Sequence, residues 1–200
     1  MYIGRFLVAG KTKNGAPFIA YRVSSTSFPN RIAKINGNTV AIIPKDLNDI
    51  FKNPYICYNC IKVVNNTVVA SNGSHTDFIA EKLSYGKRDA LATVLLAMDY
   101  EKDNYKTPRI AGILDREECY LAYIKDDELR VKKVYLKDGK GYYLGVYNSC
   151  EINEKQVIEI EGESAEEIAK YLLEYEEFEY PVASAVALIK EKIELAVANK

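Results

Sequence analysis

Apolar and polar residues alternate near the start of the chain, and this pattern predicts a β-hairpin. Residues 3–9 are apolar and typical of a strand, and the alternation resumes at residues 17–24. The segment between them contains Asn14 followed by Gly15. This pair favours the tight turn of a hairpin because both residues tolerate positive φ angles. The chain is therefore expected to open with two antiparallel strands.

Further strands are expected on both sides of a helical segment. The residues TVAII predict a strand at 39–43 that ends at Pro44. The runs IKVV and TVVA, joined by Asn65 and Asn66, predict a second hairpin. Beyond a boundary at Pro108, strands are predicted at 109–114, 119–125, 129–136 and 142–147.

Helices are predicted where apolar residues recur every three or four positions. One such segment runs from about residue 87 to residue 99, and a shorter helical turn is expected near Asp77. The buried face of the longer segment is expected to contain Leu91, Val94, Leu95 and Met98. Ser164 and Glu167 have the spacing of a capping box, which predicts that a helix begins there. A last helix is predicted after Pro181, with the buried stripe Val186, Ile189, Ile193 and Val197.

This order of elements predicts an α+β fold. Strands joined by short turns are typical of antiparallel sheets, and the predicted helices would cover the faces of those sheets. The length of 200 residues suits one domain with a full core. No linker, repeat or low-complexity segment divides the chain, so we expect residues 1–200 to form a single domain.

The charge balance gives no broad attraction to nucleic acid or to an anionic membrane. Lys and Arg number 27 and Asp and Glu number 28, so we expect no nucleic-acid partner. No stretch approaches about 18 consecutive apolar residues, so we expect no membrane partner. The N-terminus lacks a basic segment followed by a long apolar one, which favours a cytoplasmic location. The four cysteines are then expected to be free thiols.

Two motifs with metal ligands or nucleophiles have ordinary explanations. Cys57 and Cys60 have the spacing of a zinc or redox motif, but in an extended segment residues three apart point to opposite faces. No second cysteine pair follows them. His75 is the single histidine, which excludes a histidine-rich metal site, and we interpret it as a surface residue or a neighbour of a helix start. We expect no metal.

Two polar stretches each allow a functional and an ordinary interpretation. Residues 21–31, YRVSSTSFPNR, supply hydroxyl and guanidinium donors suited to phosphate oxygens. The chain has no P-loop or dinucleotide fingerprint, and a polar loop with one structural arginine explains this stretch equally well. Residues 99–103, DYEKD, place Glu101 beside Lys102 at a helix end. They indicate either a solvated surface or two groups with shifted pKa values.

Five motifs in this order resemble those of the archaeal-type IMP cyclohydrolases, the PurO family. They are MYIGRFLVAG, AYRVSSTSFPNR, NPYICYNCI, SNGSHTD and LLAMDYEKDNYKTPRIAG. They lie within residues 1–112, and the rest of the chain agrees only in general pattern. The resemblance implies a four-layer α-β-β-α sandwich similar to the N-terminal nucleophile hydrolases. The N-terminal nucleophile itself would be absent, because residue 1 is Met and is followed by the bulky Tyr2.

The resemblance also implies a reaction and its residues. The reaction is closure of 5-formamidoimidazole-4-carboxamide ribonucleotide (FAICAR) to inosine monophosphate with loss of water, the last step of de novo purine biosynthesis. The implied partner is this small purine nucleotide, and no cofactor or metal is implied. The implied catalytic residues are Arg22, Tyr58, Glu101 and Lys102. The implied substrate-binding residues are Ser24, Ser25, Arg31, Asn59 and Asn72.

The resemblance suggests a role for each group. Arg22 and Lys102 would stabilise the developing oxyanion or place the formyl group, with Arg22 facing the reacting ring. Tyr58 would give the formyl oxygen a proton, and Glu101 would orient or deprotonate the carboxamide. The amide of Asn59 would hold the carboxamide. The phosphate would be bound by Arg31, Ser24 and Ser25.

Two other functions remain open at this point. The first is an amide hydrolase of the same fold with an internal nucleophile, Cys60 or Ser74, beside His75. The second is a non-catalytic nucleotide- or RNA-binding module that uses Arg22, Arg31 and nearby tyrosines. The sequence does not determine the oligomeric state, and a homo-oligomer is compatible with it.

Overall fold

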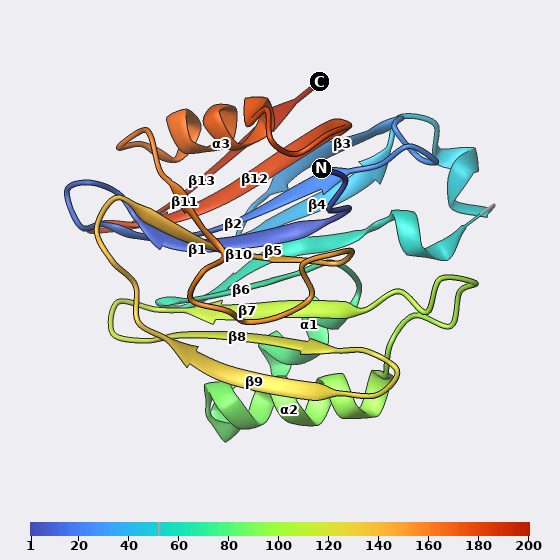
Figure 1. Cartoon of the computed structure of the whole chain (residues 1–200), viewed down its shortest axis with the longest axis horizontal. Helices are drawn as coiled ribbons and strands as arrows, with labels where there is room; N and C mark the ends of the chain where they lie inside the picture. The colour runs from blue at the N-terminus through green and yellow to red at the C-terminus, as the bar shows by residue number, and fades with distance from the viewer. Residues whose placement is uncertain (52) are drawn as a thin grey trace.

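The strands form two antiparallel sheets (Figure 1) within residues 1–51 and 53–200, which the computed structural model describes. Sheet A contains β1 (Phe6–Lys11), β2 (Pro17–Ser24), β10 (Lys140–Gly145), β11 (Val157–Glu159), β12 (Pro181–Ile189) and β13 (Ile193–Asn199). Sheet B contains β3 (Arg31–Asn36), β4 (Thr39–Pro44), β5 (Tyr58–Val64), β6 (Thr67–Ser71), β7 (Arg109–Leu114), β8 (Cys119–Ile124) and β9 (Leu129–Val134). The strand order is β11-β10-β1-β2-β12-β13 in sheet A and β3 to β9 consecutively in sheet B.

Helices cover the outer face of each sheet. The helices are α1 (His75–Glu81), α2 (Lys87–Met98) and α3 (Ala165–Glu174), with short 3₁₀ turns η1 (Leu47–Phe51), η2 (Pro54–Ile56) and η3 (Leu83–Tyr85). Helix α3 packs on β12 and β13, whereas α1 packs on β5 and β6 and α2 on β8 and β9. Figure 1 shows α3 above sheet A, with α1 and α2 below sheet B. The structure is an α+β sandwich, as the sequence pattern predicts.

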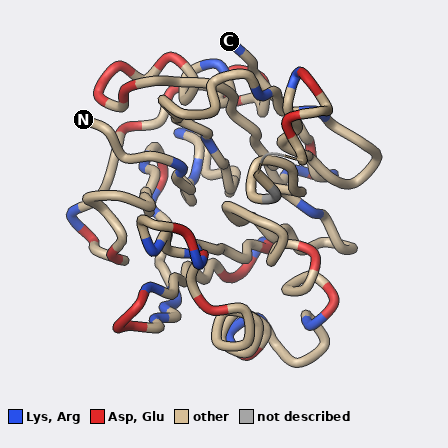
Figure 2. The backbone as a smooth tube through the Cα atoms, turned by 90° about the vertical axis from the view of Figure 1, so that its right-hand side faces the viewer, with Lys and Arg blue, Asp and Glu red and all other residues tan. Residues whose placement is uncertain are grey.

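Charged residues of both signs are mixed over the surface. Figure 2 shows the side that faces right in Figure 1, and its basic and acidic segments are interspersed along the loops. This agrees with a formal net charge of −1. In the part of the chain that the structure describes, no helix has the length and apolar character needed to cross a membrane.

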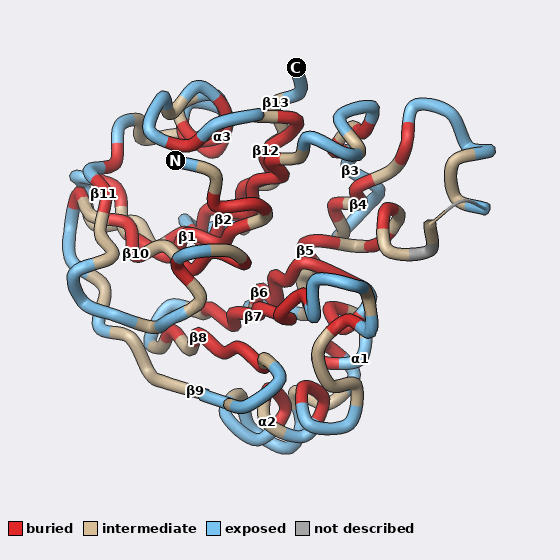
Figure 3. Tube along the Cα trace, turned by 45° about the vertical axis from the view of Figure 1, so that its right-hand side comes forward, coloured by how far each residue is buried: buried red, intermediate tan, exposed pale blue. Residues whose placement is uncertain are grey.

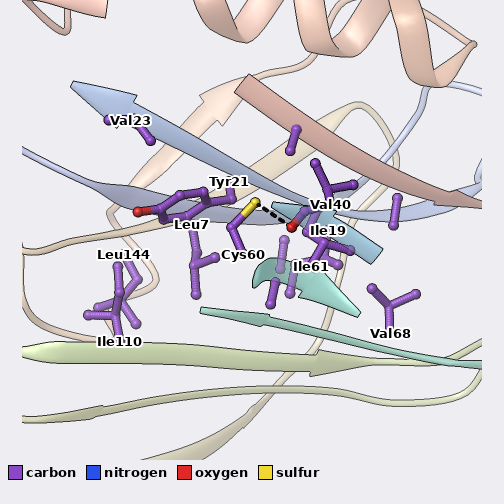
Figure 4. Packing of buried hydrophobic residues seen from close by; sticks show 14 of the residues in the cluster. Leu7, Ile19, Tyr21, Val23, Val40, Cys60, Ile61, Val68, Ile110 and Leu144 are labelled. Atoms are coloured by element: carbon purple, nitrogen blue, oxygen red, sulfur yellow. Dashed lines mark hydrogen bonds between the residues drawn. The ribbon is translucent and has the colours of Figure 1, made fainter. Parts of the chain in front are cut away.

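The core between the sheets decides which side chains face each other. Figure 3 shows that burial is concentrated along the central strands of both sheets. Between the sheets lie Leu7, Tyr21, Cys60 and Ile110 (Figure 4). The Cys60 Sγ donates a hydrogen bond to the Val40 carbonyl at 3.3 Å. All four cysteines are free thiols, as predicted.

Most predicted elements are confirmed. Both hairpins form, and α2 occupies most of the predicted helical segment. The capping box is also present, because the Ser164 Oγ accepts from the Glu167 N–H at 3.2 Å and the Glu167 carboxylate accepts from the Ser164 N–H at 3.0 Å. Strands β3 and β11 lie at sheet edges and were not predicted, since their short sequences carry little alternation.

The predicted last helix is wrong, because residues 181–199 form the hairpin β12–β13. Strand β12 lies between β2 and β13 and faces the other sheet on one side and α3 on the other. Its residues from Val182 to Ile189 are therefore all buried. A strand buried on both faces has no polar–apolar alternation. Val186 and Ile189 belong to β12, whereas Ile193 and Val197 belong to β13, so the spacing that imitates a helix stripe runs across the turn of the hairpin.

Candidate active site

A cavity of about 220 Å³ opens at one end of the sandwich. Its walls come from residues 2–5, the segment 24–31 that follows β2, the segment 53–56, the loop 101–107 after α2, and Tyr147. In Figure 1 the loop after α2 and the segment between β4 and β5 both lie at the right-hand end. Loops at the end of a rigid scaffold are a usual place for binding and catalytic groups.

The most unusual group in this cavity is a buried carboxylate held by arginine. Glu101 is 2% exposed, and its two oxygens accept hydrogen bonds from Arg5 Nη1 at 3.1 Å and Nη2 at 3.0 Å. Arg109 Nη1 lies 3.9 Å from Glu101 Oε1. Burial alone would lower the pKa of Arg5, but the charge of Glu101 and the phenols of Tyr58 and Tyr21 outweigh it and raise that pKa. Arg5 therefore remains charged.

The loop that carries Glu101 is fixed by its own hydrogen bonds. The Glu101 N–H donates to the Thr107 carbonyl at 2.8 Å. The Asp103 carboxylate accepts from the Thr107 N–H at 2.9 Å and from its hydroxyl at 2.6 Å. At the end of α2, Asp99 has a φ of 56°, and its carbonyl accepts from Arg109 Nε at 2.7 Å. The carboxylate is thus held in place before any ligand binds.

Tyr58 lies deeper, beside a second tyrosine. The hydroxyls of Tyr58 and Tyr21 are 2.7 Å apart, and their rings meet edge to face with centroids 6.3 Å apart. Arg5 is close enough to both phenols for each to influence its pKa. Tyr58 itself does not line the cavity, but Arg5, which does, lies near this phenol and holds the Glu101 carboxylate.

The cavity also has donors suited to an anion. The Ser24 hydroxyl is buried and has no partner within the described residues. The Arg31 Nε donates to the Phe28 carbonyl at 3.0 Å, which fixes the guanidinium, and its Nη atoms have no partner in the described part of the chain. The Ser25 Oγ accepts from the Phe28 N–H at 3.0 Å and keeps its own proton to donate. These groups match the predicted phosphate site in chemistry.

An aromatic wall completes the cavity. Tyr2 and Tyr147 stack with centroids 5.9 Å apart and an interplanar angle of 30°. Gly4 has a φ of +73°, and a Cβ at this position would lie 2.6 Å from the Tyr147 ring. Only glycine fits between this backbone and that ring.

Arg22 lies on the other face of sheet A, which corrects the expectation that it faces a reacting ring. It is fully buried, and its guanidinium donates to the carbonyls of Leu172 at 2.9 Å, Tyr175 at 3.1 Å and Phe178 at 2.5 Å. Consecutive strand residues face opposite sides, so Tyr21 points between the sheets and Arg22 points toward α3. Burial lowers the pKa of Arg22 to about 10, and the side chain stays charged at neutral pH.

Replacing Arg22 with methionine is expected to affect stability and not chemistry. The change leaves three carbonyls at the end of α3 without their donors, and hydrogen bonds to a charged group contribute about 1.5–3 kcal/mol each. We expect the free energy of unfolding to fall by about 3 kcal/mol, measured by urea denaturation. The turnover rate of the folded fraction is expected to stay within about twofold of the parent. A 100-fold loss of turnover with unchanged stability would restore the catalytic interpretation.

Besides Tyr58, three other predicted residues lie outside the cavity. Lys102 has a side chain that is 59% exposed and pairs with Asp99 at 2.5 Å, so the structure does not bring it together with Glu101. Asn59 points toward α1, where its amide donates to both Asp77 oxygens at 3.2 and 3.0 Å. The amide of Asn72 is used within sheet B: it donates to the Pro108 carbonyl and accepts from the Ile110 N–H, both at 2.9 Å.

Asn72 still touches the site through its backbone. Its carbonyl accepts from Arg5 Nη1 at 3.2 Å, so it helps to position the guanidinium that holds Glu101. Arg5 itself was missed by sequence reasoning. A lone arginine in MYIGR has no neighbouring polar cluster, and only its position just before β1 could have suggested a role.

The groups needed for an internal amide hydrolase are not assembled. His75 is the first residue of α1, as one of the two interpretations expected, but it is fully buried and not a surface residue, and its Nε2 is 3.0 Å from the Ile110 carbonyl. Burial, with a smaller effect of Arg109, lowers the pKa of His75 to about 3. Cys60 lies in the core between the sheets, where burial raises the pKa of its thiol. His75 is not poised as a base and Cys60 is not poised as a nucleophile. Ser74, the other candidate nucleophile, is exposed at the N-cap of α1 and has no hydrogen bond to His75 within the described residues.

Known proteins resemble this chain over its whole length. The family described as IMP cyclohydrolase-like protein matches residues 2–193. The IMP cyclohydrolase of Methanocaldococcus jannaschii is 71% identical and covers 100% of both chains. The IMP cyclohydrolase of Methanococcus maripaludis strain S2 is 58% identical over 98% of this chain and 99% of its own. That of Methanosphaera stadtmanae is 41% identical over 100% of both chains.

Proposed function

The chain belongs to the IMP cyclohydrolase family, and from this premise we propose that it closes FAICAR to inosine monophosphate in the cavity at the end of the sandwich. The observation that carries the location is the buried Glu101, held by Arg5 in the wall of a cavity that Arg31 and the unpartnered Ser24 hydroxyl also line. A nucleotide needs both kinds of group, because its reacting ring exchanges protons and its phosphate requires cationic and hydroxyl donors.

The reaction needs orientation and two proton transfers at each step. The carboxamide nitrogen attacks the formyl carbon and loses one proton, while the formyl oxygen gains one proton. The resulting hydroxyl then leaves as water while the formamido nitrogen loses its proton. No enzyme nucleophile is required, and holding the two groups in near-attack geometry can supply several kcal/mol, of the order of 7–11 kcal/mol at most. Metal-free catalysis remains a prediction.

The structure supports a revised set of roles. Glu101 accepts a hydrogen bond from the carboxamide N–H on a lone pair not used by Arg5, and takes the proton as the C–N bond forms. Tyr58 gives its proton to the formyl oxygen. The charge that stabilises that oxygen comes from Arg5, in place of Arg22 and Lys102. Tyr58 regains a proton from the formamido nitrogen, and Glu101 gives its own to the leaving hydroxyl, so the enzyme is restored.

The phosphate and the ring have separate binding surfaces in this proposal. Arg31, Ser24 and Ser25 bind the phosphate, and the wall formed by Tyr2 and Tyr147 stacks on the imidazole. Planar aromatic contacts of this kind contribute about 0.5–1.5 kcal/mol beyond area burial. We further propose that residues 1–200 act as a single cytoplasmic catalytic domain.

We also propose that the sandwich is the four-layer fold of the N-terminal nucleophile hydrolases, without their N-terminal nucleophile. In support, the Met1 amine donates to the Glu177 carbonyl at 2.7 Å and lies 3.7 Å from the Glu179 carboxylate. It is therefore held at the surface and not in the cavity. Arg5 stands just before β1, between the sheets, and takes part in the site instead.

The direct test supplies FAICAR to the purified protein, with and without a chelator such as EDTA, and follows inosine monophosphate by absorbance. We expect turnover in both conditions. Absence of product with folded protein would overturn the proposed function, and loss of product only with chelator would overturn the metal-free mechanism.

Replacing Arg31 with alanine is expected to raise KM for FAICAR by at least about 30-fold, with a smaller fall in kcat. A charge-assisted pair with phosphate is lost, and such hydrogen bonds contribute about 1.5–3 kcal/mol each. Arg130→Ala, which removes an exposed arginine paired with Glu128, is the matched control and should leave KM unchanged. An Arg31→Ala enzyme with the parent KM would contradict the phosphate assignment.

A further inference from the structure

Tyr21 is a buried phenol whose hydroxyl has one partner within the described residues. The side chain is 0% exposed and lies in the core between the sheets. Its Oη is 2.7 Å from the Oη of Tyr58. Sequence reasoning gave Tyr21 no role, and the proposed reaction uses only Tyr58.

The difference in burial favours Tyr21 as the donor, because Tyr21 is 0% exposed and Tyr58 is 7% exposed. If Tyr58 donated to Tyr21, the proton of Tyr21 would be buried without an acceptor, at a cost of about 1–3 kcal/mol. If Tyr21 donates, its proton is satisfied and the proton of Tyr58 is free to point elsewhere. Burial, together with the neighbouring Tyr58, raises the pKa of Tyr21 well above its ordinary value, so Tyr21 keeps the proton that it donates.

We propose that Tyr21 is a positioning residue for ring closure, which donates its hydrogen bond to Tyr58 Oη and so directs the Tyr58 proton toward the formyl oxygen of the substrate. This inference rests on the proposed function. Tyr21 does not touch the substrate and transfers no proton. When the proton moves from Tyr58 Oη to the formyl oxygen, the phenolate left behind keeps the hydrogen bond from Tyr21 and lies near the positive charge of Arg5.

The geometry makes this role specific to the hydroxyl. The edge-to-face contact of the two rings, at an interplanar angle of 75°, depends on the carbon skeleton and survives removal of the oxygen. Tyr21→Phe therefore keeps the packing and removes only the donor. In that variant the Tyr58 hydroxyl loses its fixed partner, and its proton is no longer directed to one acceptor.

The test is a double-mutant cycle of Tyr21→Phe and Tyr58→Phe, with kcat and KM for FAICAR measured for each enzyme. We expect Tyr21→Phe to lower kcat about tenfold, with KM within twofold of the parent. If Tyr21 acts only through Tyr58, the double variant has the same kcat as Tyr58→Phe alone. Tyr123→Phe is the matched control, because Tyr123 is another buried tyrosine between the sheets, bonded to Glu128. It should keep the parent kcat.

The outcomes separate this inference from the function on which it rests. A folded parent enzyme that does not convert FAICAR overturns the proposed function. An active parent with unchanged kcat in Tyr21→Phe overturns only the role of Tyr21, and so does a double variant in which the two losses multiply. Unfolding midpoints of Tyr21→Phe and Tyr123→Phe are compared to confirm that both variants are folded at the assay temperature.

Discussion

Replacing Glu101 with glutamine is expected to lower kcat for ring closure by about 10³-fold. Glutamine has the same shape, but it cannot take a proton from the carboxamide nitrogen, and general-base catalysis typically contributes about 10²–10⁴-fold. Its amide NH₂ also faces Arg5 Nη1 or Nη2, where the carboxylate accepts two hydrogen bonds in the native enzyme. Steady-state kinetics with FAICAR measure the loss.

The control for Glu101→Gln is Glu118→Gln. Glu118 also pairs with two cations, Lys87 at 3.0 Å and Lys133 at 2.6 Å, but it lies outside the cavity. The Glu118→Gln enzyme should keep the parent kcat. This control separates the loss of a carboxylate in the site from the loss of an ion pair elsewhere. A Glu101→Gln enzyme that retains more than a tenth of the parent kcat would show that Glu101 is not the base.

Local patterns predicted most strands and helices, but they did not predict which face of each strand is turned toward the second sheet. The strand at residues 17–24 was predicted correctly, and alternation then requires Tyr21 and Arg22 to face opposite sides. Nothing in the strand itself states which side meets the second sheet. That depends on α3 and β12, which lie more than 140 residues later in the chain. Arg22 was therefore expected in the site, but the structure turns Arg22 toward α3 and turns its neighbour Tyr21 toward the other sheet.

The candidate site was predictable only where polar residues cluster. Ser24, Ser25 and Arg31 stand in one polar stretch, and Glu101 stands in a charged one, so the sequence points to all four. Lys102 stands in the same charged stretch as Glu101, but its side chain faces solvent. The side chains of adjacent loop residues need not point in the same direction. No sequence pattern pointed to Arg5 as a site residue, since its partner Glu101 is 96 residues away. Such a pair is visible only after folding.

Replacing Arg5 with methionine is expected to reduce both stability and kcat/KM. The Arg5 side chain is only 12% exposed, and its guanidinium donates to both oxygens of Glu101. Removing one member of a buried ion pair leaves an uncompensated charge and costs about 3–5 kcal/mol. Arg109, at 3.9 Å, is too distant to replace two hydrogen bonds. We expect a free energy of unfolding lower by about 3 kcal/mol and a kcat/KM lower by about 10³-fold.

A double variant separates these two effects. Arg5→Met with Glu101→Met replaces the buried pair by apolar side chains, which is often neutral or stabilising for folding. The double variant should therefore recover most of the stability lost in Arg5→Met while remaining inactive. Arg116→Met, which removes an exposed arginine bonded to the Lys190 carbonyl, should change neither property.

If the double variant stays as unstable as Arg5→Met, then Arg5 stabilises the fold through contacts other than Glu101. If Arg5→Met retains the parent kcat/KM, the charge that stabilises the formyl oxygen must come from another group. Arg109 would then be the first to test, because its guanidinium is the other one that borders Glu101.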